Sequence, residues 1–399
     1  MPNILAKLPK SVLNVLNILN ERGYEAYIVG GAVRDILLNH KAVDFDICTS
    51  ALPDDVRKIF LENKYKVIET GIKHGTVTVS TNNTSYEVTT FRQDGNYLDN
   101  RHPENVNFNT SLEEDLERRD FTINALACDK NGVVYDFHDG ISDLHKKIIR
   151  TVGDPNLRFK EDALRMLRAL RFKMILKFDI EENTKNAIIE NSDLIKNVSI
   201  ERINSECFKI LDNCINMKFD GLEILLKKAY NYNANLNKND KEIFRRMPSY
   251  EMKIAYLFSK YGLEDASNRL NDLKLSNDLR TIIKRYITYT LDKDKNMIDD
   301  YHIKKYLSEY GFDEGFLLIQ YLCYLRNTDI LMIKDKIDSI KDSVVSLKNL
   351  DLDGEDLISL GYNGKEIGII LNGLVELVLM GKVKNDKKSL IKNIKRVKI

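Results

Sequence analysis

The segment GGAVRDILLNHKAVDFD, which begins at Gly30, constrains the fold of this chain more than any other. A short β-branched and aromatic run precedes it, Gly31 ends that run, and a helical pattern carrying Arg34 follows. Residues two apart on a strand point the same way, so Asp44 and Asp46 share one face of the next predicted strand. Two carboxylates on one face suit Mg²⁺, and glycines at a helix N-terminus let backbone N–H groups approach a phosphate. The segment therefore predicts an α/β fold with phosphate chemistry.

The predicted secondary structure changes once along the chain, from alternating strands and helices to helices alone. The N-terminal part alternates, with a helix predicted over 9–22 and strands over 24–29, 43–48, 65–70, 75–80, 85–91, 122–128 and 133–137. After Gly153 nearly every segment has helical spacing. The length of 399 residues suffices for roughly two to four compact units. The predicted fold class is an α/β N-terminal unit with a mixed sheet and helices, followed by an all-α remainder.

Composition constrains the binding partners and the cellular compartment that we expect for this protein. The net charge is +1, so any nucleic-acid partner must be recognised by local clusters rather than by overall charge. The five cysteines form neither a CxxC pair nor a zinc-type spacing, which favours buried thiols in a reducing compartment. The N-terminal segment lacks the features of a signal peptide, and no apolar run is long enough to span a bilayer. We therefore expect a cytoplasmic protein that makes no membrane contact.

Further polar residues accompany the predicted strands. Arg34 falls in the first turn of its helix, where its guanidinium fork suits a triphosphate. Arg119 stands just before the strand over 122–128 and Asn124 on it, which suggests phosphate and ribose contacts. Glu87 is either a third metal-binding carboxylate or an ordinary exposed strand residue. No GxxxxGK[ST] segment occurs, which excludes a P-loop enzyme.

One helix is predicted over the run RFKEDALRMLRALRF at 158–172. At 100° per residue its apolar stripe consists of Ala163, Met166, Leu167 and Leu170. The remaining face carries Asp162, Arg165, Arg168 and Arg171. Asp162 and Arg165, three residues apart, are expected to form an ion pair that reads the edge of a base. With Asp162 as the only expected counter-charge, this face favours a polyanionic ligand.

These motifs together resemble those of the class II nucleotidyltransferase superfamily, specifically the bacterial-type CCA tRNA nucleotidyltransferases. The resemblance rests on GGAVRDILL at 30–38, DFDICT at 44–49, TGIKHGTVTV at 70–79, RRDFTINALA at 118–127 and RTVGDPNLRFKEDALRMLRALRF at 150–172. Motif matches cover the first half of the chain, and looser ones lie near Gly354 and Gly361. The resemblance implies a catalytic nucleotidyltransferase head over 1–149, a base-recognising neck over 150–222, a body over 223–308 and a tRNA-binding tail over 309–399.

The resemblance also implies a role for each site residue. Asp44 and Asp46 would be the catalytic residues that hold Mg²⁺, while Gly31, with Gly30 beside it, and Arg34 would lie at the triphosphate. Contacts to the nucleotide would come from Arg119, Asp162, Arg165, Arg168 and Arg171, of which Asp162 and Arg165 accept CTP and ATP and reject UTP and GTP. The expected partner is tRNA, bound through its acceptor end and elbow. No protein partner is indicated.

The activity implied by the resemblance is template-independent addition of CCA to tRNA by two-metal nucleotidyl transfer that releases pyrophosphate. Relatives on the same scaffold add only A, add only CC, or make poly(A). The loop at 92–103 resembles that of enzymes that add the terminal A, which disfavours the CC-adding alternative. An enzyme that adds only A is the leading alternative, and a non-catalytic RNA-binding protein is the rival from another class. The segment at 382–399, with eight Lys or Arg against one Asp, could touch the tRNA backbone.

Overall fold

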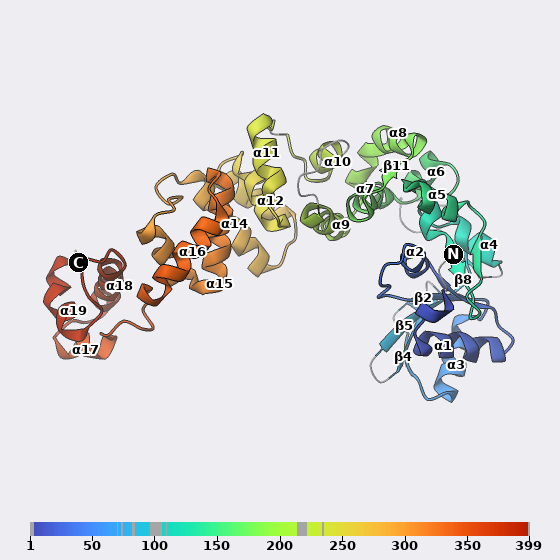
Figure 1. The fold of residues 1–399 in the computed structure, drawn as a ribbon, viewed down its shortest axis with the longest axis horizontal. Helices are drawn as coiled ribbons and strands as arrows, with labels where there is room; N and C mark the ends of the chain where they lie inside the picture. The colour runs from blue at the N-terminus through green and yellow to red at the C-terminus, as the bar shows by residue number, and fades with distance from the viewer. Residues whose placement is uncertain are drawn as a thin grey trace. The chain divides into compact units, whose positions relative to one another are not determined.

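The computed structural model describes residues 4–69, 71–72, 75–81, 84–95, 106–108, 110–213, 222–233 and 235–397. The chain forms two compact units, one reaching residue 233 and the other running from residue 235 to the C-terminal end (Figure 1). None of the helices in these ranges is both long and apolar enough to cross a membrane. The predicted turn at Asn82-Asn83 and most of the loop at 92–103 lie outside the described residues.

The first unit is built on a mixed sheet. Its strand order is β3 (Lys66–Ile68), β4 (Thr76–Thr81), β5 (Thr84–Thr90), β2 (Asp46–Thr49), β1 (Ala26–Val29), β8 (Leu126–Cys128) and β9 (Val134–Asp136). Only the β2–β5 pair in this sheet is parallel. Shorter strand pairs join β6 (Gln93–Asp94) to β7 (Val106–Asn107), and β10 (Ile148–Ile149) to β11 (Asp179–Ile180). This confirms the predicted fold class for the N-terminal part.

Helices of the first unit follow amphipathic patterns. The helix predicted over 9–22 is α1 (Lys10–Glu21), which buries an i, i+3, i+4, i+7 stripe of Val12, Val15, Leu16 and Leu19. Around the sheet lie α2 (Gly31–Leu37), α3 (Pro53–Glu62), α4 (Leu112–Glu117) and α5 (Gly140–Lys146). Five further helices complete this unit: α6 (Pro155–Glu161), α7 (Leu164–Leu176), α8 (Glu182–Asn191), α9 (Ile200–Asn213) and α10 (Leu222–Ala229). Helices α7 and α9 run side by side, so residues of α9 reach the polar face of α7 (Figure 1).

The described part of the second unit is helical, as predicted. It contains α11 (Lys238–Arg246), α12 (Tyr250–Ser259), α13 (Leu263–Asp272), α14 (Asn277–Leu291), α15 (Asp300–Arg326), α16 (Ile330–Ile340), α17 (Gly354–Ser359), α18 (Lys365–Leu379) and α19 (Lys387–Asn393). The turn signal at Gly311 appears as a kink inside α15, where Gly311 has φ 78°. A compact apolar cluster of the last helices includes Leu357, Ile370, Leu374 and Leu390. The predicted division of the chain into head, neck, body and tail remains a prediction.

Candidate active site

The glycine turn between β1 and α2 brings two predicted phosphate-binding arginines together. Gly30 has φ 74°, a backbone conformation that glycine adopts without strain. A Cβ at Gly30 would lie 3.2 Å from Nη1 of Arg119, and one at Gly31 would lie 3.5 Å from Nη2 of Arg34. The absence of a Cβ at Gly30 therefore lets the Arg119 guanidinium lie against the turn, whereas a Cβ at Gly31 would make only ordinary van der Waals contact with Arg34.

The predicted aspartate pair lies beside this turn. Asp44 and Asp46 are exposed while Phe45 and Ile47 are buried, so the predicted alternation of faces is present. The strand itself begins at Asp46 and not near residue 43, because the partner strand β1 ends at Val29, opposite Asp46. Residues before Asp46 thus have no partner on β1.

The charged groups around Asp46 come both from the glycine turn and from the neighbouring aspartate. Partial desolvation by the surrounding protein raises the pKa of Asp46, the guanidinium of Arg119 opposes that rise, and the nearby carboxylate of Asp44 adds to it. Asp46 therefore feels a positive and a negative neighbour at once. Two carboxylates that repel each other at an exposed strand start suit a divalent cation, since Mg²⁺ keeps waters and substrate phosphates among its ligands.

The position of Glu87 is compatible with a supporting role. The register pairs Ile47 with Val88 in the parallel β2–β5 ladder, so Glu87 is level with Asp46 and on the same exposed face. Within the described part of the chain, however, no three Asp, Glu, His or Cys side chains converge closely enough to hold a metal ion. The structure thus offers two carboxylates for a metal, and the role of Glu87 as a third stays a prediction.

The strand predicted over 122–128 is partly wrong. Thr122–Asn124 forms a 3-10 turn, and β8 begins at Leu126. The Asn124 side chain accepts a 2.6 Å hydrogen bond from Nη1 of Arg34 and donates a 3.1 Å bond to Asp120. The turn therefore aims Asn124 at Arg34, and its amide oxygen orients that guanidinium.

Asp115 on α4 is a site residue that the sequence reasoning missed. Its fully buried carboxylate accepts from Arg118 at 2.7 Å and from Arg119 at 3.3 Å. Burial alone would raise the pKa of Asp115, but the two arginines outweigh it and hold that pKa below its usual value. The i, i+3 and i, i+4 spacing in EEDLERRD was the signal that could have identified this anchor.

The single helix predicted over 158–172 is wrong. Helix α6 ends at Glu161, Asp162 has extended backbone angles (φ −144°, ψ 102°), and α7 begins at Leu164. The reason is local, because the Asp162 side chain accepts a 3.1 Å hydrogen bond from the backbone N–H of Leu164, and such bonds compete with a continuous helix. The predicted apolar stripe of this segment is nevertheless confirmed, with all four of its residues buried: Ala163, Met166, Leu167 and Leu170.

The expected ion pair between Asp162 and Arg165 is also wrong. Asp162 instead accepts a 2.8 Å hydrogen bond from Arg202 on α9, while Arg165 pairs with Glu161 at 2.6 Å. Arg165 is buried, and its Nη2 donates to the backbone carbonyl of Arg118 at 3.0 Å. The break between the helices separates the two side chains that a continuous helix would have joined.

The other two arginines of α7 have carboxylate partners that were not predicted. Arg168 lies 2.6 Å from the buried Asp120, and Arg171 lies 3.2 Å from Glu206 of α9. Burial opposes ionisation of Asp120, yet Arg168 and the hydrogen bond from Asn124 hold its pKa low. The expectation of a single counter-charge, Asp162, on this face is therefore wrong, and the arginines are held in fixed ion pairs.

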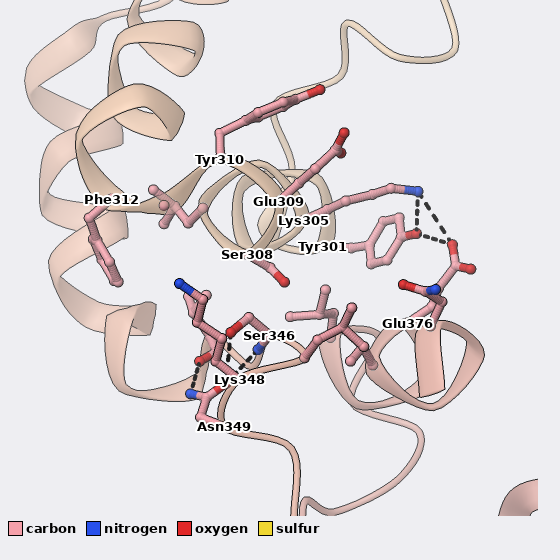
Figure 2. A pocket seen from close by; sticks show the side chains of 17 residues that line it. Tyr301, Lys305, Ser308, Glu309, Tyr310, Phe312, Ser346, Lys348, Asn349 and Glu376 are labelled. Atoms are coloured by element: carbon pink, nitrogen blue, oxygen red, sulfur yellow. Dashed lines mark hydrogen bonds and ion pairs between the residues drawn. The ribbon is translucent and has the colours of Figure 1, made fainter. Parts of the chain in front are cut away.

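A separate cavity of about 770 Å³ lies in the second unit, between α15, α18 and the segment 344–349 (Figure 2). On one wall Tyr301 and Lys305 of α15 reach Glu376 of α18, with the Tyr301 hydroxyl 2.5 Å from the carboxylate. None of the predicted site residues lines this cavity.

Three family models match successive parts of the chain. Residues 26–150 match the poly A polymerase head domain, residues 177–214 match a probable RNA and SrmB-binding site of polymerase A, and residues 246–394 match a putative domain 2 of tRNA nucleotidyltransferases. The CCA-adding enzyme of Ligilactobacillus salivarius is 38% identical, over 97% of this chain and 96% of its own length. That of Staphylococcus haemolyticus is 37% identical over 96% of each. The chain belongs to the CCA-adding enzyme family.

Solved structures of CCA-adding enzymes have the same fold. The Bacillus stearothermophilus enzyme in complex with CTP has a TM-score of 0.80 and 32% identity, covering 97% of this chain and 96% of that one. The Thermotoga maritima enzyme complexed with tRNA_CCA has a TM-score of 0.71 over 99% and 98%, and at 21% identity it shows the fold alone. These matches confirm the predicted family, fold class and enzyme class. CCA-adding enzymes are nucleotidyltransferases that generally use a divalent metal ion.

Proposed function

We propose that this chain adds CCA to the 3′ end of tRNA from CTP and ATP, with Mg²⁺ bound by Asp44 and Asp46. The observation that supports this most is the meeting of two exposed carboxylates with the guanidiniums of Arg34 and Arg119 at one glycine turn. Carboxylates that hold a metal and arginines that hold phosphate are the parts that nucleotidyl transfer requires. The relatives named above carry the same activity in their names.

In the proposed reaction the tRNA 3′-hydroxyl attacks the α-phosphorus of the nucleotide. A bond forms between that oxygen and phosphorus, the hydroxyl proton passes to water, and the bond to the bridging oxygen breaks, so pyrophosphate leaves with the electron pair. Arg34 and Arg119 bind the triphosphate and offset the charge that develops on the leaving group. Mg²⁺ on Asp44 and Asp46 would activate the hydroxyl and stabilise negative charge on the phosphate oxygens.

We assign the choice of base to Asp162, between α6 and α7, and to Arg165 in the first turn of α7. Asp162 presents a carboxylate held by Arg202, and Arg165 presents a guanidinium held by Glu161 and two backbone carbonyls. Groups fixed in this way offer an acceptor and donors in a set geometry, as recognition of a base edge requires. Arg168 and Arg171 are held in the same way by Asp120 and Glu206, and we assign them to further contacts with the nucleotide.

The partner and setting follow from the same proposal. tRNA would bind with its acceptor end at the head, while its elbow meets the helical tail, and the reaction would take place in the cytoplasm. Addition of A alone is the second candidate, although the named relatives are CCA-adding enzymes.

Three tRNA transcripts test the proposal, one ending at the discriminator base, one with C added and one with CC added. Each is incubated with Mg²⁺ and CTP, ATP or both, and sized on a gel. Completion of all three to CCA supports the proposed function. Extension of only the CC-ended transcript by one A supports the A-adding alternative, and no extension of any transcript contradicts both.

A further inference from the structure

We infer that Phe172 is a positioning residue whose ring holds Arg34 of the head against two arginines of α7. The inference rests on the proposed function, because it concerns how that site keeps its geometry. The guanidinium carbons of Arg34, Arg168 and Arg171 lie 5.1, 5.6 and 4.6 Å from the centroid of the Phe172 ring. Cations within about 6 Å of a ring centroid are attracted by the ring quadrupole.

The ring is itself held in place. Phe172 is 7% exposed on α7, and the fully buried Phe121 meets it edge to face, with centroids 5.7 Å apart. Phe121 directly precedes the 3-10 turn that carries Asn124, the residue that orients Arg34. The same ring is thus supported by the segment that positions the triphosphate arginine.

Three guanidiniums around one ring repel one another. Burial lowers the pKa of Arg171, Glu206 opposes this effect, and the nearby charges of Arg168 and Arg34 lower that pKa further. Each guanidinium hydrogen-bonds through its N–H groups to a different anchor: Asn124 and Asp35 for Arg34, Asp120 for Arg168, and Glu206 for Arg171. These anchors hold each guanidinium on the side away from the ring. The Phe172 ring attracts all three guanidiniums and so offsets their mutual repulsion.

A purely structural Phe172 would behave differently from a positioning one. An apolar core residue stabilises through the area it buries, so isosteric rings of any polarity would serve equally. A ring that attracts cations depends on its quadrupole, which fluorine weakens step by step with little change in size. A fluorination series at position 172 therefore separates the two roles.

The experiment replaces Phe172 in the full chain with mono-, di-, tri- and pentafluorophenylalanine. We measure KM for CTP and for ATP, kcat with a tRNA transcript, and the thermal midpoint. The same series at Phe60, a fully buried ring of α3 that packs on Tyr65, is the matched control. Phe172→Leu and Phe172→Tyr complete the set, since tyrosine keeps the π face.

The inference predicts that KM for both nucleotides rises by a similar factor with each fluorine, reaching about three- to tenfold for the pentafluoro ring. Phe172→Tyr should restore KM relative to Phe172→Leu, and the Phe60 series should leave KM unchanged. A flat KM series at position 172 in an active enzyme overturns this inference alone. A wild-type chain that incorporates no nucleotide overturns the proposed function, and the inference with it.

Discussion

Asp44, just before β2, and Asp46, its first residue, are both exposed and contribute no apolar burial, so the fold does not depend on them. We predict that Asp44→Ala and Asp46→Ala each lower nucleotide incorporation by roughly a thousandfold, because loss of a metal ligand removes several kcal/mol of charge stabilisation. The thermal midpoint should change little. Incorporation of labelled CMP and a melting curve measure the two effects. Full activity in either variant would refute the assignment of that residue to the metal.

Arg165 combines a proposed recognition role with burial. Its guanidinium contacts Glu161 and the carbonyls of Arg118 and Arg158, so Arg165→Ala should cost about 1.5–3 kcal/mol of unfolding free energy. Glu161 keeps Arg158 as a partner at 3.2 Å, which limits that loss. We expect discrimination against UTP and GTP, measured as ratios of kcat/KM, to fall more than affinity for the triphosphate. Unchanged ratios would exclude Arg165 from base selection.

At the residue scale, the sequence predicted which charged side chains gather at the candidate site. It did not predict the residues with which those side chains form ion pairs. Asp44, Asp46 and Arg34 lie around one turn because β1, α2 and β2 follow one another in the chain, whereas Arg119 reaches that turn from the segment after α4. The anchor of Arg168 could not be predicted, because Asp120 lies 48 residues earlier in the chain. Such a pair forms only when α7 packs beside the segment 118–121, and periodicity within one helix carries no information about it.

At the scale of elements, the glycine turn should be sensitive to a single methyl group. Gly30→Ala places a Cβ 3.2 Å from Nη1 of Arg119 and adds a strained positive φ. The matched control is Gly23→Ala, because Gly23 has φ 86° but nothing within 4 Å of its added Cβ. Both variants should lose stability from backbone strain, Gly23→Ala by about 1–2 kcal/mol and Gly30→Ala by at least as much, because φ 74° with ψ −133° is a conformation that alanine rarely adopts. Only Gly30→Ala should raise KM for CTP and ATP. An equal rise in both variants would contradict the proposal that the glycine turn positions Arg119.

The junction of α11 with α12 offers a test by pH. Asp240 on α11 is 7% exposed and accepts hydrogen bonds from the Tyr256 hydroxyl at 2.6 Å and from Lys260 at 2.7 Å. Burial alone would raise the pKa of Asp240, but these bonds outweigh it and hold that pKa below its usual value. A lowered folded-state pKa stabilises the fold above the unfolded-state pKa of about 3.9, and the stabilisation is lost as pH falls through the folded-state pKa.

Asp240→Asn should therefore lower the free energy of unfolding at pH 7 by about 1–3 kcal/mol and make stability less dependent on pH below about pH 4. Urea unfolding at several pH values measures both effects. Asp342→Asn, at an exposed aspartate of the same unit, is the control. An identical acid dependence in Asp240→Asn and the wild type would contradict the role of this carboxylate.

Helices and strands were predicted correctly where their apolar pattern was long. The prediction failed where a side chain hydrogen-bonded to the nearby backbone and interrupted the pattern. Helix α1 and the hairpin strands β4 and β5 match their predicted ranges closely. The break at Asp162 was missed because its neighbours fit one helical period, while the aspartate accepts from the backbone of Leu164 instead. The strand signal over 122–128 likewise concealed the 3-10 turn that aims Asn124 at Arg34.

At the scale of the whole molecule, the proposed catalytic residues and the proposed tRNA-binding segment lie in different units. Every residue assigned to metal, triphosphate or base lies in the first unit, and the basic C-terminal segment lies in the second. The change from alternating to helical signals falls near Gly153, whereas the first unit reaches residue 233, so this change does not mark the boundary between the units. The sequence alone does not give the unit boundary, because the segment near it continues the helical pattern on both sides.

The last prediction concerns the basic segment of the second unit. Leu390 and Ile394 are buried in the apolar cluster of the last helices, while Lys388, Lys392 and Lys395 are exposed at i, i+4 and i+7. Lys388 and Lys392 thus share one exposed face of α19, and Lys395 is exposed in the 3-10 turn that follows. If these lysines neutralise tRNA phosphates, replacing all three by glutamine should weaken tRNA binding and leave KM for CTP unchanged.

Counterion release gives this prediction a quantitative form. Each lost phosphate contact to a duplex reduces the slope of log K against log salt by about 0.9, so the triple variant should lose up to about 2.7. Binding of a tRNA transcript measured between about 50 and 200 mM salt gives the slope. The control replaces exposed Lys185 of α8 with glutamine. An unchanged slope in the triple variant would exclude these lysines from the tRNA contact, because three charges near phosphate cannot be removed without changing the number of counterions released.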